Sequence, residues 1–315
     1  MTCPKCQHDH SKRFGTYGKS KTQRYRCRDC SATFSVRPPQ PLGNHTTELD
    51  AVAQAFSMML EGASVRAVSR LTGIHKNTLL RLLLTVGEKC QRVFDAKMQN
   101  IKPRHVQADE LWGYLHTKAR RVKANDPAEY GDVYLWIALD ADTKAVLSFY
   151  VGKRDGFSAY EFVGDLSKRI TSRFQLTTDG LEAYVPAVEE HFGADIDFAQ
   201  LIKTYSTPQT SGPDWFRPSK IVSVRPQPVM GDPDLADVST SYVERFNLSV
   251  RMHLRRFTRL TNAFSKSLTH LKAAVALFVA WYNFCRPHQS LHGVTPAMEA
   301  GLTDHVWSVA ELVTT

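Results

Sequence analysis

RHVQADELWGYL, residues 104–115, is the stretch that decides the fold of this chain. It is rich in β-branched and aromatic residues, which is typical of a β-strand. Two segments of the same kind follow, DVYLWIALDADT at 132–143 and KAVLSFYVG at 144–152. DADTK at 140–144 predicts a turn between them. The three segments predict consecutive strands.

The residues that follow alternate between helix and strand. We predict a helix from Ser158, as the N-cap, to Arg169, and another over 181–193 that Gly193 closes. FQLTTDG at 174–180 reads as a short buried strand that ends in a tight turn, and 196–205 as a further strand. The order β-β-β-α-β-α-β predicts a mixed α/β layer.

Residues 206–240 contain six Pro and two Gly, which predicts a long loop. From Ser241 the chain is expected to be mostly helical. Residues 268–285 are apolar nearly all round, as in a buried core helix. We find no run of about 18 apolar residues that predicts a membrane span, and no secretory signal at the N-terminus. A reducing cytosol is the expected compartment.

The net charge of +9 is unevenly distributed along the chain. Residues 1–100 carry 16 Lys and Arg against 7 Asp and Glu, and residues 101–315 carry 24 of each. A local basic excess favours a polyanionic partner, because each cation that meets a phosphate releases a counterion. Charge alone leaves open a ribosomal contact or a role in solubility.

Four cysteines form two CxxC pairs, Cys3 with Cys6 and Cys27 with Cys30, separated by 20 residues. This spacing predicts a zinc ribbon at 1–37, in which four thiolates bind one structural Zn²⁺. Disulfides or idle thiols are the alternative, and a cytosolic location disfavours them. The ribbon is rich in basic and aromatic residues, which favours DNA over protein docking, with Arg24 and Arg26 among the expected DNA contacts.

SVRAVSRLTGIHKNTLLRLLLTVGE, residues 64–88, predicts a helix-turn-helix within an all-α segment at 44–100. Ser64 is the expected N-cap, and Val65, Val68 and Leu71 the apolar stripe. Gly73 supplies a left-handed turn before a second helix near His75. The start of that helix would enter the major groove of DNA. The expected contacts are His75, Lys76, Asn77, Thr78 and Arg81. An ordinary helical hairpin in a protein core is the alternative.

Three acids occur where predicted elements end or turn, Asp109, Asp179 and Glu244. Carboxylates at strand ends point to the crevice in which α/β sheets bind ligands. Three of them can hold two Mg²⁺ ions, which activate a water or a 3′-hydroxyl for attack on a phosphodiester. Capping or turn formation is the alternative for any one acid. The nearby competitors are Glu110, Asp140, Asp142 and Glu182, and the turn at 140–144 accounts for Asp140 and Asp142.

The segment SYVERFNLSV at 241–250 places Glu244 ahead of arginines with no further acid up to Arg259. At about 100° per residue, Arg251 and Arg255 lie on the side of Glu244, and Arg259 is nearby. Val243, Phe246, Val250, Leu254 and Phe257 form a separate apolar face. We therefore expect Glu244 to reach the crevice and the arginines to follow the phosphates of DNA.

The chain resembles bacterial transposases of the insertion-sequence-one family, in the DDE superfamily. The resemblance lies in CPKC, CRDC and SATFS (31–35), QADELW (107–112), TTDGLEAY (177–184), YVERFNLSVRMHLRRFTRLTNAFSK (242–266) and WYNFCRPHQSLHGVTPAMEAGL (281–302). It spans nearly the whole chain. It implies a ribonuclease H-like catalytic domain at 101–315 with a mixed sheet, and that Asp109, Asp179 and Glu244 match the family's three metal-binding acids.

The resemblance implies a multidomain DNA transposase that binds terminal inverted repeats, then cuts and joins DNA. The expected cofactors are two Mg²⁺ or Mn²⁺ ions at the active site and one structural Zn²⁺. The expected partner is double-stranded DNA, with a homodimer or larger assembly on it, no membrane, and a bacterial cytoplasmic, nucleoid-associated location. A catalytically inactive DNA-binding regulator and a ribonuclease H-like nuclease without strand transfer are the alternatives.

Overall fold

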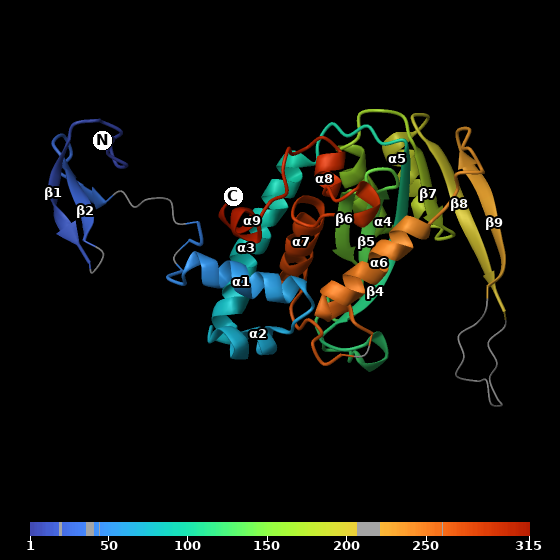
Figure 1. The fold of residues 1–315 in the computed structure, drawn as a ribbon, viewed down its shortest axis with the longest axis horizontal. Coiled ribbons are helices and arrows are strands. Elements are labelled where there is room, and N and C mark those ends of the chain that lie inside the picture. The colour runs from blue at the N-terminus through green and yellow to red at the C-terminus, as the bar shows by residue number, and fades with distance from the viewer. Residues whose placement is uncertain (19–20, 36–40, 44, 207–220, 260) are drawn as a thin grey trace. The chain divides into compact units, whose positions relative to one another are not determined.

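The computed structural model describes residues 1–18, 21–35, 41–43, 45–206, 221–259 and 261–315. The chain divides into two compact units, an N-terminal unit at Met1–Thr46 and a C-terminal unit at Thr47–Thr315. The helices and strands of both are labelled in Figure 1. Residues 38–40, between the predicted zinc ribbon and the predicted all-α segment, and residues 207–220 of the predicted loop lie outside the described residues.

The N-terminal unit is a small antiparallel sheet of β1 (Ser11–Tyr17), β2 (Thr22–Cys27) and β3 (Thr33–Ser35). Tyr25 stacks on Phe34 with ring centroids 5.9 Å apart, and few other side chains are buried. So small an apolar core cannot hold a fold of this length by itself, and the unit therefore depends on a further cross-link.

The C-terminal unit is built on a six-stranded sheet in the order β6-β5-β4-β7-β8-β9. Its strands are β4 (His105–Leu115), β5 (Gly131–Asp140), β6 (Val146–Gly152), β7 (Gln175–Asp179), β8 (Asp197–Tyr205) and β9 (Ile221–Met230). The central strand β4 pairs antiparallel with β5 and parallel with β7. The mixed sheet predicted from the sequence is confirmed.

The structure corrects one prediction about the connections of this sheet and confirms another. The expected loop at 206–240 is wrong in part, because β9 pairs antiparallel with β8 and its two prolines sit in an edge strand that tolerates them. The turn after β5 is confirmed, since Asp140 accepts hydrogen bonds from the amide of Asp142 at 3.0 Å and the hydroxyl of Thr143 at 2.7 Å.

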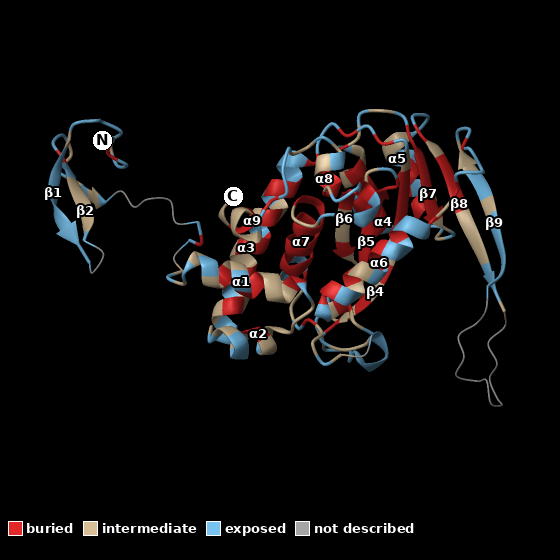
Figure 2. Ribbon diagram, viewed as in Figure 1, coloured by how far each residue is buried: buried red, intermediate tan, exposed pale blue. Residues whose placement is uncertain are grey.

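Helices cover both faces of the sheet, and the buried residues shown red in Figure 2 concentrate between the layers. On one face, Trp136 of β5 packs on Phe162 of α4 (Gly156–Ser167) and Tyr184 of α5 (Tyr184–Phe192). The predicted N-cap Ser158 is wrong, because Asp155 caps α4 by accepting from the amide of Ser158 at 2.9 Å. Gly193 ends α5 as predicted.

Three helices precede the sheet, α1 (Leu49–Leu60), α2 (Val65–Thr72) and α3 (Lys76–Lys97). Ser64 caps α2, and Gly73 ends it at φ 73°, as predicted. Val68 is buried, but the predicted place of Leu71 in the apolar stripe is wrong, since it is 70% exposed. Phe94 of α3 packs edge-on against Phe149 of β6 at 5.0 Å, which fixes α3 on the sheet.

The C-terminal third contains α6 (Ser241–His253), η2 (Arg255–Phe257), α7 (Leu268–Phe284), η3 (Gln289–Leu291), α8 (Pro296–Glu299) and α9 (Val309–Thr314), while η1 (Ala119–Arg121) precedes β5. The predicted apolar face of α6 is buried. The helix ends at His253, however, so extrapolating a helical period to Arg255 and Arg259 is wrong.

The helix α7 is the buried core helix predicted from the sequence. By length and composition alone, the helical stretch Leu268–Leu291 is long and apolar enough to cross a membrane, but 72% of its most apolar window is buried inside the protein, as in a core helix. Asn283 of α7 hydrogen-bonds both backbone groups of Val146, at 3.0 and 2.9 Å. This pairing anchors α7 to β6.

We predict that Gly87→Ala destabilises the C-terminal unit. A Cβ at Gly87 would lie 2.6 Å from the Cα of Ala273 in α7, so the two helices must separate. The free energy of unfolding should fall by about 1–2 kcal/mol, because overpacking outweighs the roughly 1 kcal/mol that Ala gains in helix propensity. Gly156→Ala is the matched control in denaturant titrations, since nothing lies within 4 Å of its Cβ. Equal stability of both variants contradicts the prediction.

Candidate active site and zinc centre

Two of the predicted acids meet where β4 lies beside β7. Asp109 is in the middle of β4, and Asp179 ends β7. Carboxylate oxygens of Asp109, Asp179 and Glu110 all lie within 4.8 Å of one another. Glu110, which the sequence offers only as a competitor, is thus part of the group. Three carboxylates at this spacing supply hard oxygen ligands for a divalent cation.

The proximity of these acids alters their protonation. Burial, followed by the charge of Asp179, raises the pKa of Asp109 to about 6. The same two causes, in the same order, raise the pKa of Glu110 to about 7. The Oε1 atom of Glu110 is buried without a hydrogen bond among the described residues. A positive charge placed among the acids would offset the cost of burying ionised carboxylates and the repulsion between them.

Arg154, just beyond β6, partly neutralises the group. Its Nε donates to Glu110 at 3.1 Å and its Nη2 to Asp179 at 3.3 Å. The Asp179 carboxylate also accepts the amide of Leu181 at 3.0 Å, and Gln200 donates to the backbone carbonyls of Asp179 and Leu181. These bonds fix the turn after β7, and the amide of Leu181 in that turn orients the Asp179 carboxylate.

The helix α6 is tied to β4 on either side of Asp109. Gln107, buried in β4, accepts the amides of Tyr242 and Val243 at 2.9 and 3.1 Å and so satisfies two free donors of the first turn of α6. Asn247 donates to Asp109 at 2.7 Å. Glu244 lies between these two ties in the sequence, so its backbone position relative to Asp109 is fixed.

Glu244 itself stands apart from the three-carboxylate group. Its Oε1 accepts hydrogen bonds from Lys203 of β8 and from the hydroxyl of Thr240. Burial raises its pKa, but these two bonds outweigh burial and lower the pKa overall. The charge of Glu244 nevertheless contributes to the raised pKa of Asp109. The structure therefore brings Asp109 and Asp179 together and leaves Glu244 close by, paired with a lysine.

The three arginines assigned to the α6 face differ in their surroundings. Arg251 is partly buried and donates to the carbonyl of Phe257 at 2.9 Å, so it closes the end of α6. Arg255 and Arg259 are exposed beyond the helix. The residues expected at the start of α3, His75, Lys76, Asn77 and Arg81, are also exposed. His75 also caps α3, by accepting the amide of Asn77 at 3.3 Å.

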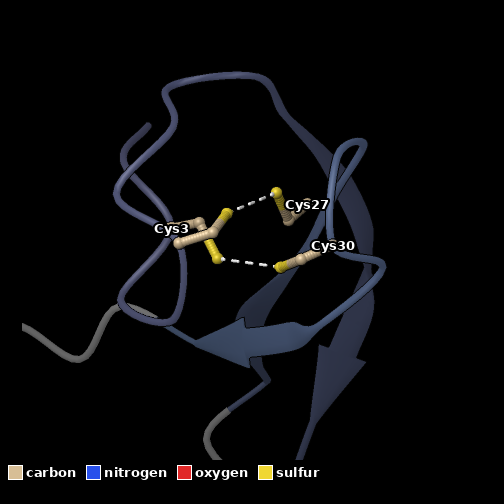
Figure 3. A group of neighbouring side chains, drawn as sticks. Cys3, Cys27 and Cys30 are labelled. Atoms are coloured by element: carbon tan, nitrogen blue, oxygen red, sulfur yellow. Dashed lines mark hydrogen bonds between the residues drawn. The ribbon is translucent and has the colours of Figure 1, made fainter.

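The four cysteines of the N-terminal unit converge, as Figure 3 shows for three of them. The Sγ atoms of Cys3 and Cys30 are 3.6 Å apart, and those of Cys6 and Cys27 are 3.5 Å apart. Four sulfurs about 2.3 Å from one Zn²⁺ would be separated by roughly 3.8 Å at tetrahedral angles. All four cysteines are free thiols, and their spacing fits a zinc ion.

The backbone around the cysteines is shaped for such a centre. Gln7 and Ser31, each directly after the second cysteine of a pair, have positive φ angles of 61° and 58°. Burial raises the pKa of Cys3, but the amides of Cys6 and Lys5 outweigh burial and lower it to about 7. On the sheet of this unit, the guanidinium groups of Arg24 and Arg26 lie over the rings of Tyr17 and Phe14.

Comparisons with known proteins bear on the segment that carries Glu244. Residues 238–296 match the family profile described as "Integrase core domain". No curated protein matches the chain. Among solved structures, the chain is similar to a piggyBac transposase in a synaptic complex with hairpin DNA, with 13% identity, coverage of 88% of this chain and 71% of that chain, and a TM-score of 0.40.

Two structures of Mos1 are less similar. A Mos1 strand transfer complex has 13% identity over 52% of this chain and 59% of that chain, with a TM-score of 0.22. A Mos1 mariner paired end complex with Mn has 12% identity over 52% and 61%, with a TM-score of 0.19. Scores this low carry no argument about function. The match of residues 238–296 to the integrase core profile is the comparison that bears on function, together with the geometry of the acids.

We predict that removing zinc unfolds the N-terminal unit alone. Without the metal, four clustered thiols and one aromatic pair do not offset the entropy of ordering the segment. A strong chelator, or Cys30→Ser, should collapse the amide NMR signals of Met1–Thr46 to random-coil chemical shifts. The signals of Thr47–Thr315 should stay unchanged. Cys285→Ser is the control, since Cys285 lies outside the cluster. Retention of the N-terminal signals after complete zinc removal would show that the centre is not structural.

We predict that Mn²⁺ stabilises the C-terminal unit at pH 8 and much less at pH 5.5. The raised pKa values of Asp109 and Glu110 mean that the metal-free folded state binds extra protons, so its stability falls as pH rises through about 4 to about 7. Mn²⁺ binds the ionised acids and reverses this loss. At 100 times its dissociation constant it should add about 2.7 kcal/mol, or roughly 5–11 °C in Tm.

Differential scanning fluorimetry of three proteins tests this prediction. Asp109→Asn should raise the metal-free Tm at pH 8 and abolish the shift with Mn²⁺. Asp195→Asn is the matched control, because Asp195 is exposed and lies outside the group of three acids. An equal Mn²⁺ shift in the wild type and Asp109→Asn, or an equal shift at both pH values, would place the metal elsewhere.

Proposed function

We propose that this protein is a DDE-type DNA transposase. Its acidic site cuts one DNA strand at the end of a mobile element and joins the new end to target DNA. The observation that carries this proposal is the group formed by Asp109 and Asp179, with Glu244 on a helix anchored to the same strand. The match of residues 238–296 to an integrase core supports it, because that segment includes Glu244.

In this proposal, Asp109, Asp179 and Glu244 hold two Mg²⁺ or Mn²⁺ ions. Bound ions of this kind activate an attacking oxygen and stabilise the leaving one. Gln107 and Asn247 orient α6 and Asp109 toward each other. Arg154 and Lys203 balance the negative charge of the acids before metal binds. Glu110 donates its amide to Asp109 and keeps its own carboxylate paired with Arg154.

The reaction proceeds in two phosphoryl transfers. In the first, a water oxygen bonds to phosphorus, the P–O3′ bond breaks, and the 3′-oxygen leaves with a proton as a free hydroxyl. In the second, that 3′-hydroxyl attacks a target phosphodiester, loses its proton to solvent, and displaces a target 3′-oxygen. Each step exchanges one P–O bond for another, so no oxidant or external energy source is required.

The remaining parts serve binding to DNA. The N-terminal unit, with Arg24 partly buried and Arg26 exposed beside aromatic rings, holds Zn²⁺ and contacts DNA. The helices α2 and α3 act as a helix-turn-helix, with His75, Lys76, Asn77 and Arg81 at the terminal inverted repeat. The proposal includes membership of the insertion-sequence-one family and a bacterial cytoplasmic, nucleoid-associated location. It also includes a homodimer or larger assembly on double-stranded DNA, because joining requires two element ends.

Cleavage of a labelled end fragment tests the proposal. With Mg²⁺ or Mn²⁺, the wild type should nick the fragment, and Glu244→Gln should bind it equally well but nick it at a rate lower by about 100-fold or more. Glu190→Gln is the matched control on exposed α5 surface and should nick normally. If Glu244→Gln cuts like the wild type, Glu244 is structural. If the wild type binds the correct end but does not cut with either metal, the protein is a regulator.

A further inference from the structure

A large cleft in the C-terminal unit lies away from the group of acids. Its volume is about 1120 Å³, and it is lined by the end of α1, the first turns of α2 and α3, the residues after α6, and α7. We call it the basic cleft. Its rim carries Arg66, Lys76, Lys118, Arg255, Arg259 and Lys266, and no Asp or Glu of the described chain lines it. A cleft that gathers one sign of charge concentrates ligands of the opposite sign.

Arg256 lies in the same cleft and has no anionic partner among the described residues. Its Nη1 donates to the hydroxyl of Ser265 at 2.7 Å, and no ion pair joins it to a carboxylate among the described residues. Burial lowers its pKa to about 10. A guanidinium held away from water without a counter-charge is costly, and an anion in the cleft offsets that cost. An internal structural role would be expected to supply a carboxylate.

The floor of the basic cleft is apolar and aromatic. It includes Leu80, Leu83 and Leu277, together with Tyr114 and Phe264, whose ring centroids are 5.0 Å apart. Phosphate groups alone require no such surface. A base does, since it stacks on aromatic side chains, but the bases of an intact duplex are already stacked on each other. The combination of cations and aromatic rings fits a strand whose bases are unpaired.

The basic cleft is connected to the acids by two elements. Tyr114 follows Asp109 by five positions on β4, so their Cα atoms are roughly 17 Å apart at the rise of a strand. Arg255 begins the turn directly after α6, the helix of Glu244. That separation spans on the order of five nucleotides at the spacing of one B-form strand. Because residues five apart on a strand point to opposite faces, β4 sets the distance between the acids and the cleft, and the turn after α6 connects the two.

We propose that the basic cleft binds an unpaired stretch of the DNA strand, with its phosphates on the Lys and Arg rim and at least one base against Tyr114 and Phe264. The identity of the polymer as DNA rests on the proposed function. The cleft thus separates and holds the end of the strand that flanks the bond cut at the acids. Lys76 and Asn77 at the start of α3 also line it, which links the helix expected to read duplex DNA to the strand that is opened.

Fluorescence anisotropy with a labelled single strand of mixed sequence, and with the corresponding duplex, tests the cationic rim. In the full chain, Arg255→Gln with Lys266→Gln should weaken single-strand binding by about 10-fold or more and reduce the slope of log affinity against log salt by about 1.4. Arg92→Gln with Lys102→Gln is the control pair, exposed and outside the cleft, and should bind like the wild type. Equal loss in both pairs, or loss of duplex binding alone, overturns the proposal.

A strand that contains 2-aminopurine tests the aromatic floor, since stacking quenches its fluorescence. The wild type should quench it, and Phe264→Leu and Tyr114→Leu should each restore fluorescence and weaken binding by about 5-fold to 100-fold. Phe157→Leu, an exposed aromatic residue outside the cleft, is the matched control. Circular dichroism and Tm verify that each variant is folded. Quenching that survives both cleft variants in folded protein overturns the base-binding role.

The two proposals fail separately. If Glu244→Gln abolishes nicking while every cleft variant binds the single strand like the wild type, the basic cleft is wrong and the transposase function stands. If the wild type does not nick DNA but binds the single strand through Arg255, Lys266 and Phe264, the cleft stands and the catalytic function falls.

Discussion

Mutual repulsion among three carboxylates at the meeting point of β4 and β7 is the constraint on which the rest of this protein depends. Asp109, Glu110 and Asp179 have carboxylate oxygens within 4.8 Å of one another. Such a group lowers the stability of the fold unless protons, cations or metal ions balance it. Arg154 supplies one balancing charge. The apolar residues of β4, β5 and α7 are buried around the acids, and this packing offsets the remaining repulsion.

The coupling of α6 to β4 turns this acidic group into a candidate active site. Gln107 holds the first turn of α6, and Asn247 reaches back to Asp109. Both ties join residues more than 130 positions apart in the sequence. Glu244 lies between these two ties in the sequence and forms an ion pair with Lys203.

Sequence patterns predict those features that arise locally. The strands around Asp109, the turn at Asp140, the cap at Ser64 and the left-handed Gly73 are confirmed, because each depends on neighbouring residues. The paired cysteines were likewise recognisable from spacing. Arg154, Lys203 and Gln107 had no local signal, since their roles depend on which strands become neighbours. The strand β9 does not follow from the sequence, because its prolines are typical of a loop. Prolines are compatible with a strand only at the edge of a sheet, and that position depends on the fold. The end of α6 at His253 was missed because helical periodicity does not indicate where packing stops a helix.

The most direct test of the account is a crystal structure with Mn²⁺, with anomalous scattering to locate the ion. The account predicts an anomalous peak bonded to Asp109 and Asp179, with the Glu244 carboxylate rotated off Lys203 toward the metal and Glu110 still on Arg154. A peak bonded to Asp109, Glu110 and Asp179 while Glu244 remains on Lys203 would contradict the assignment of Glu244. No peak at the acids, with the ion bound elsewhere, would contradict the central claim that these carboxylates form a metal site.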